Sequence, residues 1–120
     1  METQLQIAVA DYLRYQYRHV LFFHVPNGGA RWKREAGKLK RMGVLPGVPD
    51  LLIFEPRGGF HGLAIELKVK GNYPTHSQKI VLEQLNSKGW KAVSCYGFDK
   101  AREVIDAYLS ARVDLAGAKA

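Results

Sequence analysis

The spacing of apolar residues along the chain predicts an alternation of helices and strands. Apolar side chains recur every three or four positions over about 2–17, after Thr75 and after Phe98, which is the spacing of a helix with one buried face. Runs rich in branched and aromatic residues predict strands at 20–25, 51–54, 63–70 and 91–96. This order predicts an α/β fold, in which a mixed β-sheet is flanked by helices.

Turn and capping signals refine this outline. The connection 55–62 contains Pro and Gly and is typical of a hairpin, so the strands on either side of it are expected to be antiparallel. Thr75 and Gln78 fit a capping box at the start of a helix. Phe98-Asp99 is expected to cap the last helix, and the basic segment that follows Gly29 has a loosely helical pattern.

Three ionisable residues lie on the two central strands. Asp50 follows Pro49 and opens the first of them. Glu66 and Lys68 are two positions apart on the second, so their side chains point to the same face, about 6.5 Å apart along the backbone. The alternating apolar residues, Leu63, Ile65, Leu67 and Val69, take the other face. If the two strands pair, two carboxylates and an ammonium meet at one edge of the sheet.

Such a group of side chains predicts a metal site. Two adjacent carboxylates repel each other unless a cation or a proton lies between them. Their oxygens are ligands that Mg²⁺ and Mn²⁺ prefer. With a lysine beside the metal, a phosphodiester is the natural substrate.

Three further polar residues each allow two interpretations. Glu2 is either an acid that stabilises the first turn of its helix or a residue that points at the metal. Gln78 is either a helix-capping residue or a group that holds a water or a phosphate oxygen at the site. His24 is favoured as the polar tip of a half-buried strand over a catalytic histidine, because no partner lies at a fixed spacing from it.

Composition adds a basic partner-binding segment to this picture. The 120 residues suit one domain, expected over 1–112, with 113–120 as a flexible tail. The net charge of +7 suits a polyanion, although it also suits a membrane surface. Most of this charge is concentrated in one segment, whose basic residues are Arg31, Lys33, Arg34, Lys38, Lys40 and Arg41. This clustering favours binding to DNA phosphates over a merely solvated face.

Membrane and secreted classes are not indicated. The single cysteine, Cys95, cannot form an internal disulfide, and no apolar run approaches the length of a membrane span. The first residues are polar and acidic, unlike a signal peptide. A cytoplasmic protein is therefore expected.

The motifs resemble those of a nuclease superfamily. Pro49-Asp50 followed by Glu66-Leu67-Lys68 resembles the Pro-Asp and (Asp/Glu)-x-Lys signature of restriction-endonuclease-like nucleases. The surrounding residues make the resemblance more specific, to the virus-type replication-repair nuclease (VRR-NUC) domain, over about 2–96. They are Asn27-Gly28-Gly29, the basic segment, Gly47-Val48-Pro49-Asp50, Ile65-Glu66-Leu67-Lys68, Gly71 and Gln78.

The resemblance implies a role for each matching position. It implies a restriction-endonuclease-like fold in which Lys68 is the catalytic lysine and Gln78 completes the catalytic site. The implied metal ligands are Glu2, Asp50, Glu66 and the backbone carbonyl of Leu67.

The resemblance also implies an activity, namely that of a Mg²⁺-dependent endodeoxyribonuclease in which Mn²⁺ can substitute. Small free-standing members resemble phage-borne or bacterial enzymes that form homodimers and cut branched DNA, including four-way junctions. The expected setting is thus the cytoplasm of a bacterial or phage-infected cell. Two rival interpretations remain open: an inactive nuclease-fold module that binds DNA structure without cutting, and a basic interaction protein with no salt-dependent affinity for DNA.

Overall fold

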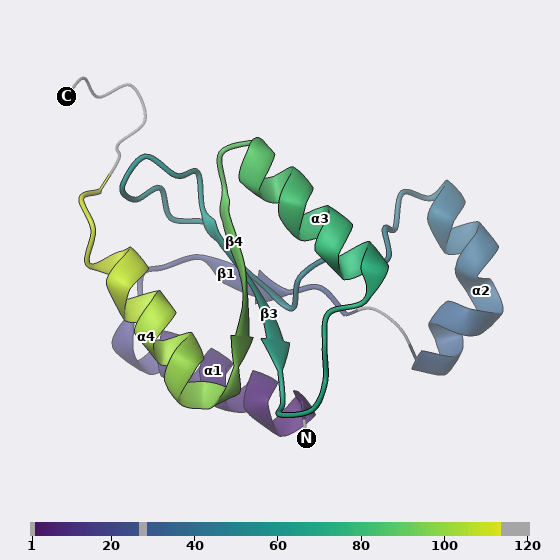
Figure 1. Ribbon diagram of the computed structural model, residues 1–120, viewed down its shortest axis with the longest axis horizontal. Coiled ribbons are helices and arrows are strands. Elements are labelled where there is room, and N and C mark those ends of the chain that lie inside the picture. Colours follow the sequence, from purple (N-terminus) through teal and green to yellow (C-terminus); the bar gives the residue numbers. More distant parts are fainter. Residues whose placement is uncertain (1, 27–28, 114–120) are drawn as a thin grey trace.

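The computed structural model of the chain describes the backbone of residues 2–26 and 29–113, and side chains over 2–26 and 33–113. Figure 1 shows the arrangement of the elements. In chain order these are α1 (Glu2–Gln16), β1 (Phe22–His24), α2 (Gly29–Arg41), β2 (Leu51–Ile53), β3 (Leu63–Lys68), α3 (His76–Ser87), β4 (Lys91–Tyr96) and α4 (Gly97–Leu109).

The four strands form one mixed sheet in the order β1-β2-β3-β4. β1 pairs antiparallel with β2, and β2 pairs antiparallel with β3, as the hairpin signal predicted. β3 and β4 are parallel, and α3 provides the crossover between them. β3 therefore lies inside the sheet, and all six of its residues are buried.

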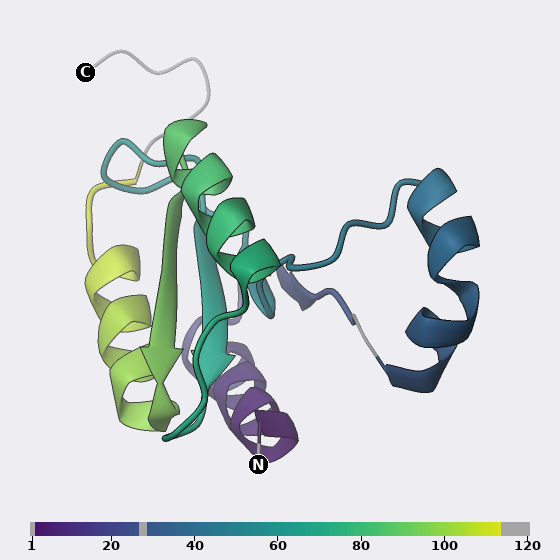
Figure 2. The same ribbon diagram turned by 45° about the vertical axis from the view of Figure 1, so that its right-hand side comes forward.

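Helices cover both faces of this sheet. α1 and α4 pack against each other and against β3 on one face, whereas α3 packs on β3 and β4 from the other side (Figure 2). The apolar core lies between the sheet and the α1–α4 pair. Its strand residues are Leu51, Ile53, Leu63, Ile65, Leu67 and Cys95. The mixed α/β fold predicted from the sequence is confirmed.

Asp106 of α4 fixes the end of α1 in this layer. Its Oδ1 accepts hydrogen bonds from the hydroxyls of Tyr12 and Tyr17, at 2.5 and 2.6 Å. Burial raises the pKa of Asp106, but these two hydroxyls and Arg102 outweigh it, so the net shift is downward. The charged carboxylate thus holds α1 at a defined position over the sheet.

Several element boundaries differ from those predicted. β1 contains only 22–24 of the predicted 20–25, because its partner β2 is also three residues long. β3 ends at Lys68 rather than at residue 70, because Lys68 pairs with Tyr96, the last residue of its parallel partner β4. The prediction that Phe98-Asp99 caps the last helix is wrong. Tyr96 is the N-cap, without a side-chain cap, and Asp99 lies in the first turn.

α2 is a helix, as the basic segment loosely predicted, but it stands apart from the other elements in Figures 1 and 2. Its backbone departs from helical geometry at Glu35, with φ −115° and ψ 16°. Over the described residues it packs against none of the other helices or strands. Gly43, with φ 100°, follows its end in the left-handed conformation that glycine adopts most easily.

The end of the domain is anchored by Arg57. Its backbone forms an isolated antiparallel bridge with Val113, and its guanidinium donates to the carbonyls of Leu109 and Ala111. The rest of the predicted tail, 114–120, lies outside the described residues. Among the helices of the described part, none is long and apolar enough to cross a membrane.

Candidate active site

The pairing of β2 with β3 brings Asp50 and Glu66 together. The last antiparallel pair is Leu51 with Ile65, and the same register places Asp50 opposite Glu66 one position further on. Directly opposed residues have Cβ atoms about 4.5–5.5 Å apart. The two carboxyl groups therefore meet at the end of the ladder, on the face of the sheet that α3 covers. The predicted meeting of two carboxylates is present in the fold.

Asp50 is fixed by groups from both neighbouring strands. Its Oδ2 accepts a hydrogen bond from the backbone N–H of Leu67 at 2.7 Å, which takes the place of the next ladder bond. Its own carbonyl lies 2.7 Å from Nδ1 of His24 on β1. A carbonyl can only accept, so Nδ1 is the protonated nitrogen of that ring.

Glu66 and Lys68 form a buried ion pair on the same face of β3. Their side chains are almost fully buried, with 2% and 6% of each residue exposed. Nζ of Lys68 lies 3.4 Å from Oε2 of Glu66. A buried ion pair carries a large desolvation cost, so it contributes little net stability. The presence of these two buried charges is therefore better explained by a functional role than by a contribution to stability.

Gln78 forms the capping box that its sequence position allowed and also contacts Glu66; that it holds a water or a phosphate oxygen stays a prediction. Its Oε1 accepts from the backbone N–H of Thr75 at 2.8 Å, and its own N–H donates to the Thr75 hydroxyl, which completes the capping box. Its Nε2 donates to Oε2 of Glu66 at 3.0 Å. One side chain thus starts α3 and orients the buried carboxylate.

The electrostatics of the pair resemble those of two acids that share a proton. Burial, and after it the negative charge of Asp50, raise the pKa of Glu66 to about 8 against the lowering effect of Lys68. Burial also raises the pKa of Asp50, although the Leu67 N–H, Glu66 and His24 lower it in part. The contact between the two carboxyl groups raises the pKa of Glu66 and lowers that of Asp50, so the pair binds a proton more tightly than an isolated acid does.

This set of donors fits a hard divalent cation. One ammonium cannot neutralise two ionised carboxylates, and burial, the main cause of both raised pKa values, makes their charged forms more costly. Carboxylate oxygens facing each other at a sheet edge are suitable ligands for Mg²⁺ or Mn²⁺. The pair would accept either a proton or a cation between its oxygens.

Glu2 lies near this pair without joining it. Its Oε2 accepts a hydrogen bond from Nδ2 of Asn72 at 2.9 Å. Its negative charge contributes to the raised pKa of Asp50. Over residues 2–26 and 29–113, no three His, Cys, Asp or Glu side chains gather closely enough to hold a metal ion. Metal ligation by Glu2, and by the carbonyl of Leu67, stays a prediction.

His24 is the residue that the sequence analysis undervalued. It is exposed rather than half-buried, and it contacts the backbone of Asp50. Its signal was weak because the contact depends on how β1 pairs with β2, and no fixed spacing in the sequence records that pairing.

The basic residues lie on α2, away from the carboxylates. The side chains that the structure describes there are all exposed or half-buried: Lys33, Arg34, Lys38, Lys40 and Arg41. The side chain of Arg31 lies outside the described part. Since α2 does not pack on the other elements, the fold does not bring these cations to the carboxylate pair.

Comparison with known proteins agrees with the motifs. The model of the VRR-NUC domain matches residues 2–99. The chain belongs to the VRR-NUC domain family. A solved structure described as a VRR_NUC domain protein is 36% identical to it, with a TM-score of 0.77, and the match covers 92% of this chain and 88% of the other. Among curated proteins, none matches the chain significantly. This VRR-NUC domain is thus a member of a nuclease family, and its paired carboxylates, Lys68 and Gln78 all lie in the matched region.

The contact between Gly47 and α3 predicts a strong effect of substitution. Gly47 has φ 89°, and a Cβ there would lie 2.6 Å from the backbone carbonyl of Ser77. Gly47→Ala is expected to lower the free energy of unfolding by about 3 kcal/mol, because it combines a strained φ with a backbone clash. The midpoint of urea denaturation measures this.

The matched control is Gly43→Ala in the same connection. Gly43 has φ 100°, but a Cβ added there would meet no atom within 4 Å, so only the φ strain applies, about 1 kcal/mol. Equal losses in the two variants would contradict the proposed clash with α3.

The raised pKa of Glu66 predicts how stability depends on pH in EDTA. The folded-state pKa is about 8 against an ordinary 4.5, so the stabilisation is fully present below pH 4.5 and is lost as the pH rises through about 8. Glu66→Gln is expected to flatten this decline, which is on the order of 5 kcal/mol at most, since each pKa unit is worth about 1.4 kcal/mol. Urea denaturation at a series of pH values measures the slope.

Glu83→Gln, at an exposed position on α3, is the control and should leave the pH slope unchanged. An unaltered slope in Glu66→Gln would show that Glu66 does not hold the proton.

Proposed function

We propose that this VRR-NUC domain is a metal-dependent DNA endonuclease that acts on branched DNA such as four-way junctions. The observation that supports it best is the pair of carboxylates, half-buried Asp50 and buried Glu66, with Lys68 at 3.4 Å from Glu66 and Gln78 at 3.0 Å from it. Membership of a nuclease family supports the same conclusion.

Asp50 and Glu66 are the residues that would hold Mg²⁺ or Mn²⁺, with Glu2 and the carbonyl of Leu67 as further candidate ligands. When bound, such an ion polarises the phosphoryl group and lowers the pKa of water. The backbone N–H of Leu67 keeps one oxygen of Asp50 in place. Gln78 does the same for Oε2 of Glu66, so both acids are oriented before any substrate binds.

Lys68 supplies a positive charge that would act on the attacking water or on the phosphate. Its ammonium is buried beside Glu66, and in a site that excludes water a charge acts more strongly than in bulk solvent. Placed there, it would orient the attacking water or stabilise negative charge on the phosphate.

The choice of branched DNA as the substrate rests on α2 and on symmetry. The cations of α2 extend from the body of the domain, where they can contact phosphates of a second duplex arm. Resolution of a four-way junction needs two symmetric cuts, and a homodimer supplies two sites related by a twofold axis.

The rival function, a module that binds DNA structure without cutting, is less well supported. Two acids forced together in a buried position destabilise the fold, as their raised pKa values indicate. A chain without catalytic use for them gains nothing by keeping this arrangement.

Removal of any central site residue is expected to abolish cleavage. Asp50→Ala, Glu66→Ala and Lys68→Ala should each lower the rate of Mg²⁺-dependent cleavage of a labelled four-way junction by about 100-fold or more, because each removes a group that acts on the reacting phosphate. DNA affinity should stay largely intact. A gel assay of nicking, with EDTA as the metal-free control, measures the rate.

The matched controls replace two exposed residues, Glu83 within α3 and Lys88 at its C-cap. Glu83→Ala is the control for the acids and Lys88→Ala is the control for the lysine. Full cleavage by all three site variants would overturn the mechanism, and tight binding by the native protein without any cleavage would favour the inactive module.

The cations of α2 are expected to dominate the salt dependence of DNA binding. Replacing them together by Gln should reduce the slope of log affinity against log salt by about 4, since each phosphate contact contributes about 0.9. Fluorescence anisotropy at a series of salt concentrations measures the slope. The replaced residues are Lys33, Arg34, Lys38, Lys40 and Arg41.

A control variant removes positive charge from exposed positions elsewhere and should change the slope much less. Its substituted residues are Lys79, Lys88, Lys100 and Arg102. Equal slopes in the two variants would mean that net charge, rather than α2, attracts the DNA.

A further inference from the structure

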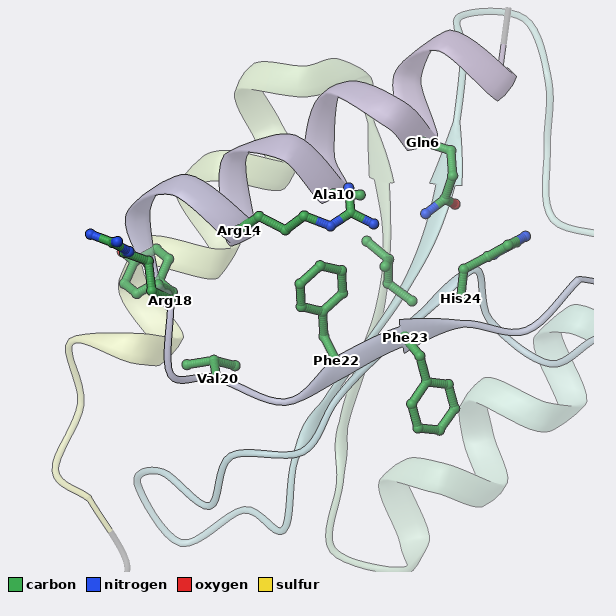
Figure 3. A pocket seen from close by; sticks show the side chains of 10 residues that line it. Gln6, Ala10, Arg14, Arg18, Val20, Phe22, Phe23 and His24 are labelled. Atoms are coloured by element: carbon green, nitrogen blue, oxygen red, sulfur yellow. The ribbon is translucent and has the colours of Figure 1, made fainter.

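A cavity of about 370 Å³ lies between α1 and β1, on the face of the sheet opposite the carboxylate pair. Its volume is within the range of small-ligand sites, about 300–1,000 Å³. Figure 3 shows the residues that line it. Those that matter for its chemistry are Gln6, Arg14, Val20, Phe22, His24 and Leu51.

Two polar side chains of α1 and one aromatic ring of β1 converge on this cavity. In Figure 3, Gln6 points from α1 toward the sheet, and Arg14 extends across the space above the ring of Phe22. The guanidinium carbon of Arg14 is 5.7 Å from the centre of that ring. Arg18 and Phe23, by contrast, point away from the space.

The amide of Gln6 has an unmet hydrogen-bonding requirement. Its Nε2 is buried and, among the described residues, has no acceptor. A buried donor without a partner costs about 1–3 kcal/mol. A rotation of this side chain toward the cavity would bring Nε2 beside a ligand acceptor and recover the hydrogen bond.

We propose that this cavity binds one unpaired nucleobase of the DNA substrate. The exposed side chain of Arg14 moves outward from the ring of Phe22, so that the base stacks on that ring and the guanidinium covers the other face of the base. A ring nitrogen or carbonyl at the edge of the base accepts the hydrogen bond from Gln6. Proteins that recognise unpaired bases use aromatic rings and arginine planes in this way. The proposal rests on the function proposed above and adds to it a preference for DNA with unpaired nucleotides near the cut.

The lining favours a base over a phosphate group. Part of the wall is apolar, from Ala10, Val20, Phe22 and Leu51, and a phosphate placed against that part would lose its water without compensation. The charge of Arg14 is already partly matched by Asp11 at 3.3 Å. A flat, uncharged ring with a polar edge fits these walls better.

The cavity lies close to the carboxylate pair along the chain and through the sheet. Leu51 follows Asp50 directly, and consecutive strand residues point to opposite faces. His24 lines the cavity and also contacts the carbonyl of Asp50. β1 is the edge strand of the sheet, so a single strand of DNA can pass around this edge from one face to the other. A nucleotide next to the scissile phosphate is therefore the expected occupant.

The test measures binding, in EDTA, of the 120-residue chain to a four-way junction and to a splayed duplex. An abasic analogue is placed in turn at each position near the branch, which removes one base but keeps its phosphate. At one or two positions the affinity should fall by about fivefold to a hundredfold, the contribution of one stacked base.

Two variants identify the cavity as the place where that base binds. Gln6→Met and Arg14→Ala should weaken binding of intact DNA and should reduce the difference between intact and abasic DNA. Gln4→Met, at an exposed position of the same helix outside the cavity, is the control and should keep the full difference. Circular dichroism and the thermal midpoint establish that each variant is folded.

The outcomes separate this proposal from the proposed function. If the protein cuts junctions and an abasic position never changes the affinity, the cavity holds no base, although the nuclease assignment stands. An abasic effect of equal size in Gln6→Met, Arg14→Ala and Gln4→Met would also overturn the proposal, because the base would bind elsewhere. If the native protein neither binds nor cuts DNA, the proposed function fails first and the base site fails with it.

Discussion

The structure depends on two carboxyl groups that oppose each other across an antiparallel strand pair. The register of β2 and β3 places Asp50 against Glu66, and the position of β3 inside the sheet buries Glu66 almost completely. Like charges in such a position are unfavourable, so the site needs Lys68, a proton or a cation to relieve them. The strand pairing that builds the core therefore also creates the need for a positive charge or a proton at the site.

The carboxylate pair is also supported by α3 and by the connection that leads to Asp50. Gln78 joins the start of α3 to Glu66, and Gly47 allows the connection to lie directly against Ser77. Thus the segment before Asp50 and the helix that supports Glu66 are in contact with each other. A displacement of this segment or of α3 would therefore move both acids. For this reason the geometry of a site with few residues depends on long segments of the chain.

Much of this could be predicted from the sequence, because alternation and turn signals are local. The strand character of 63–68, the hairpin before it and the capping box at Thr75 each depend on neighbouring residues, and so Asp50, Glu66, Lys68 and Gln78 could be grouped in advance. The contact of His24 with Asp50, and the position of Arg14 over Phe22, could not. They follow from how α1 crosses the sheet and how an edge strand pairs, and the spacing of residues along the chain does not encode either.

The separation of α2 from the other elements affects how easily this helix can change its conformation. A helix of 13 residues without tertiary support is near the length at which isolated helices are marginal in water, about 12–15 residues. Its backbone amides lack the protection that burial gives to those of β3. In the function proposed above, an arm with so small a penalty for bending can follow duplexes that diverge at different angles, while Asp50 and Glu66 keep one fixed geometry.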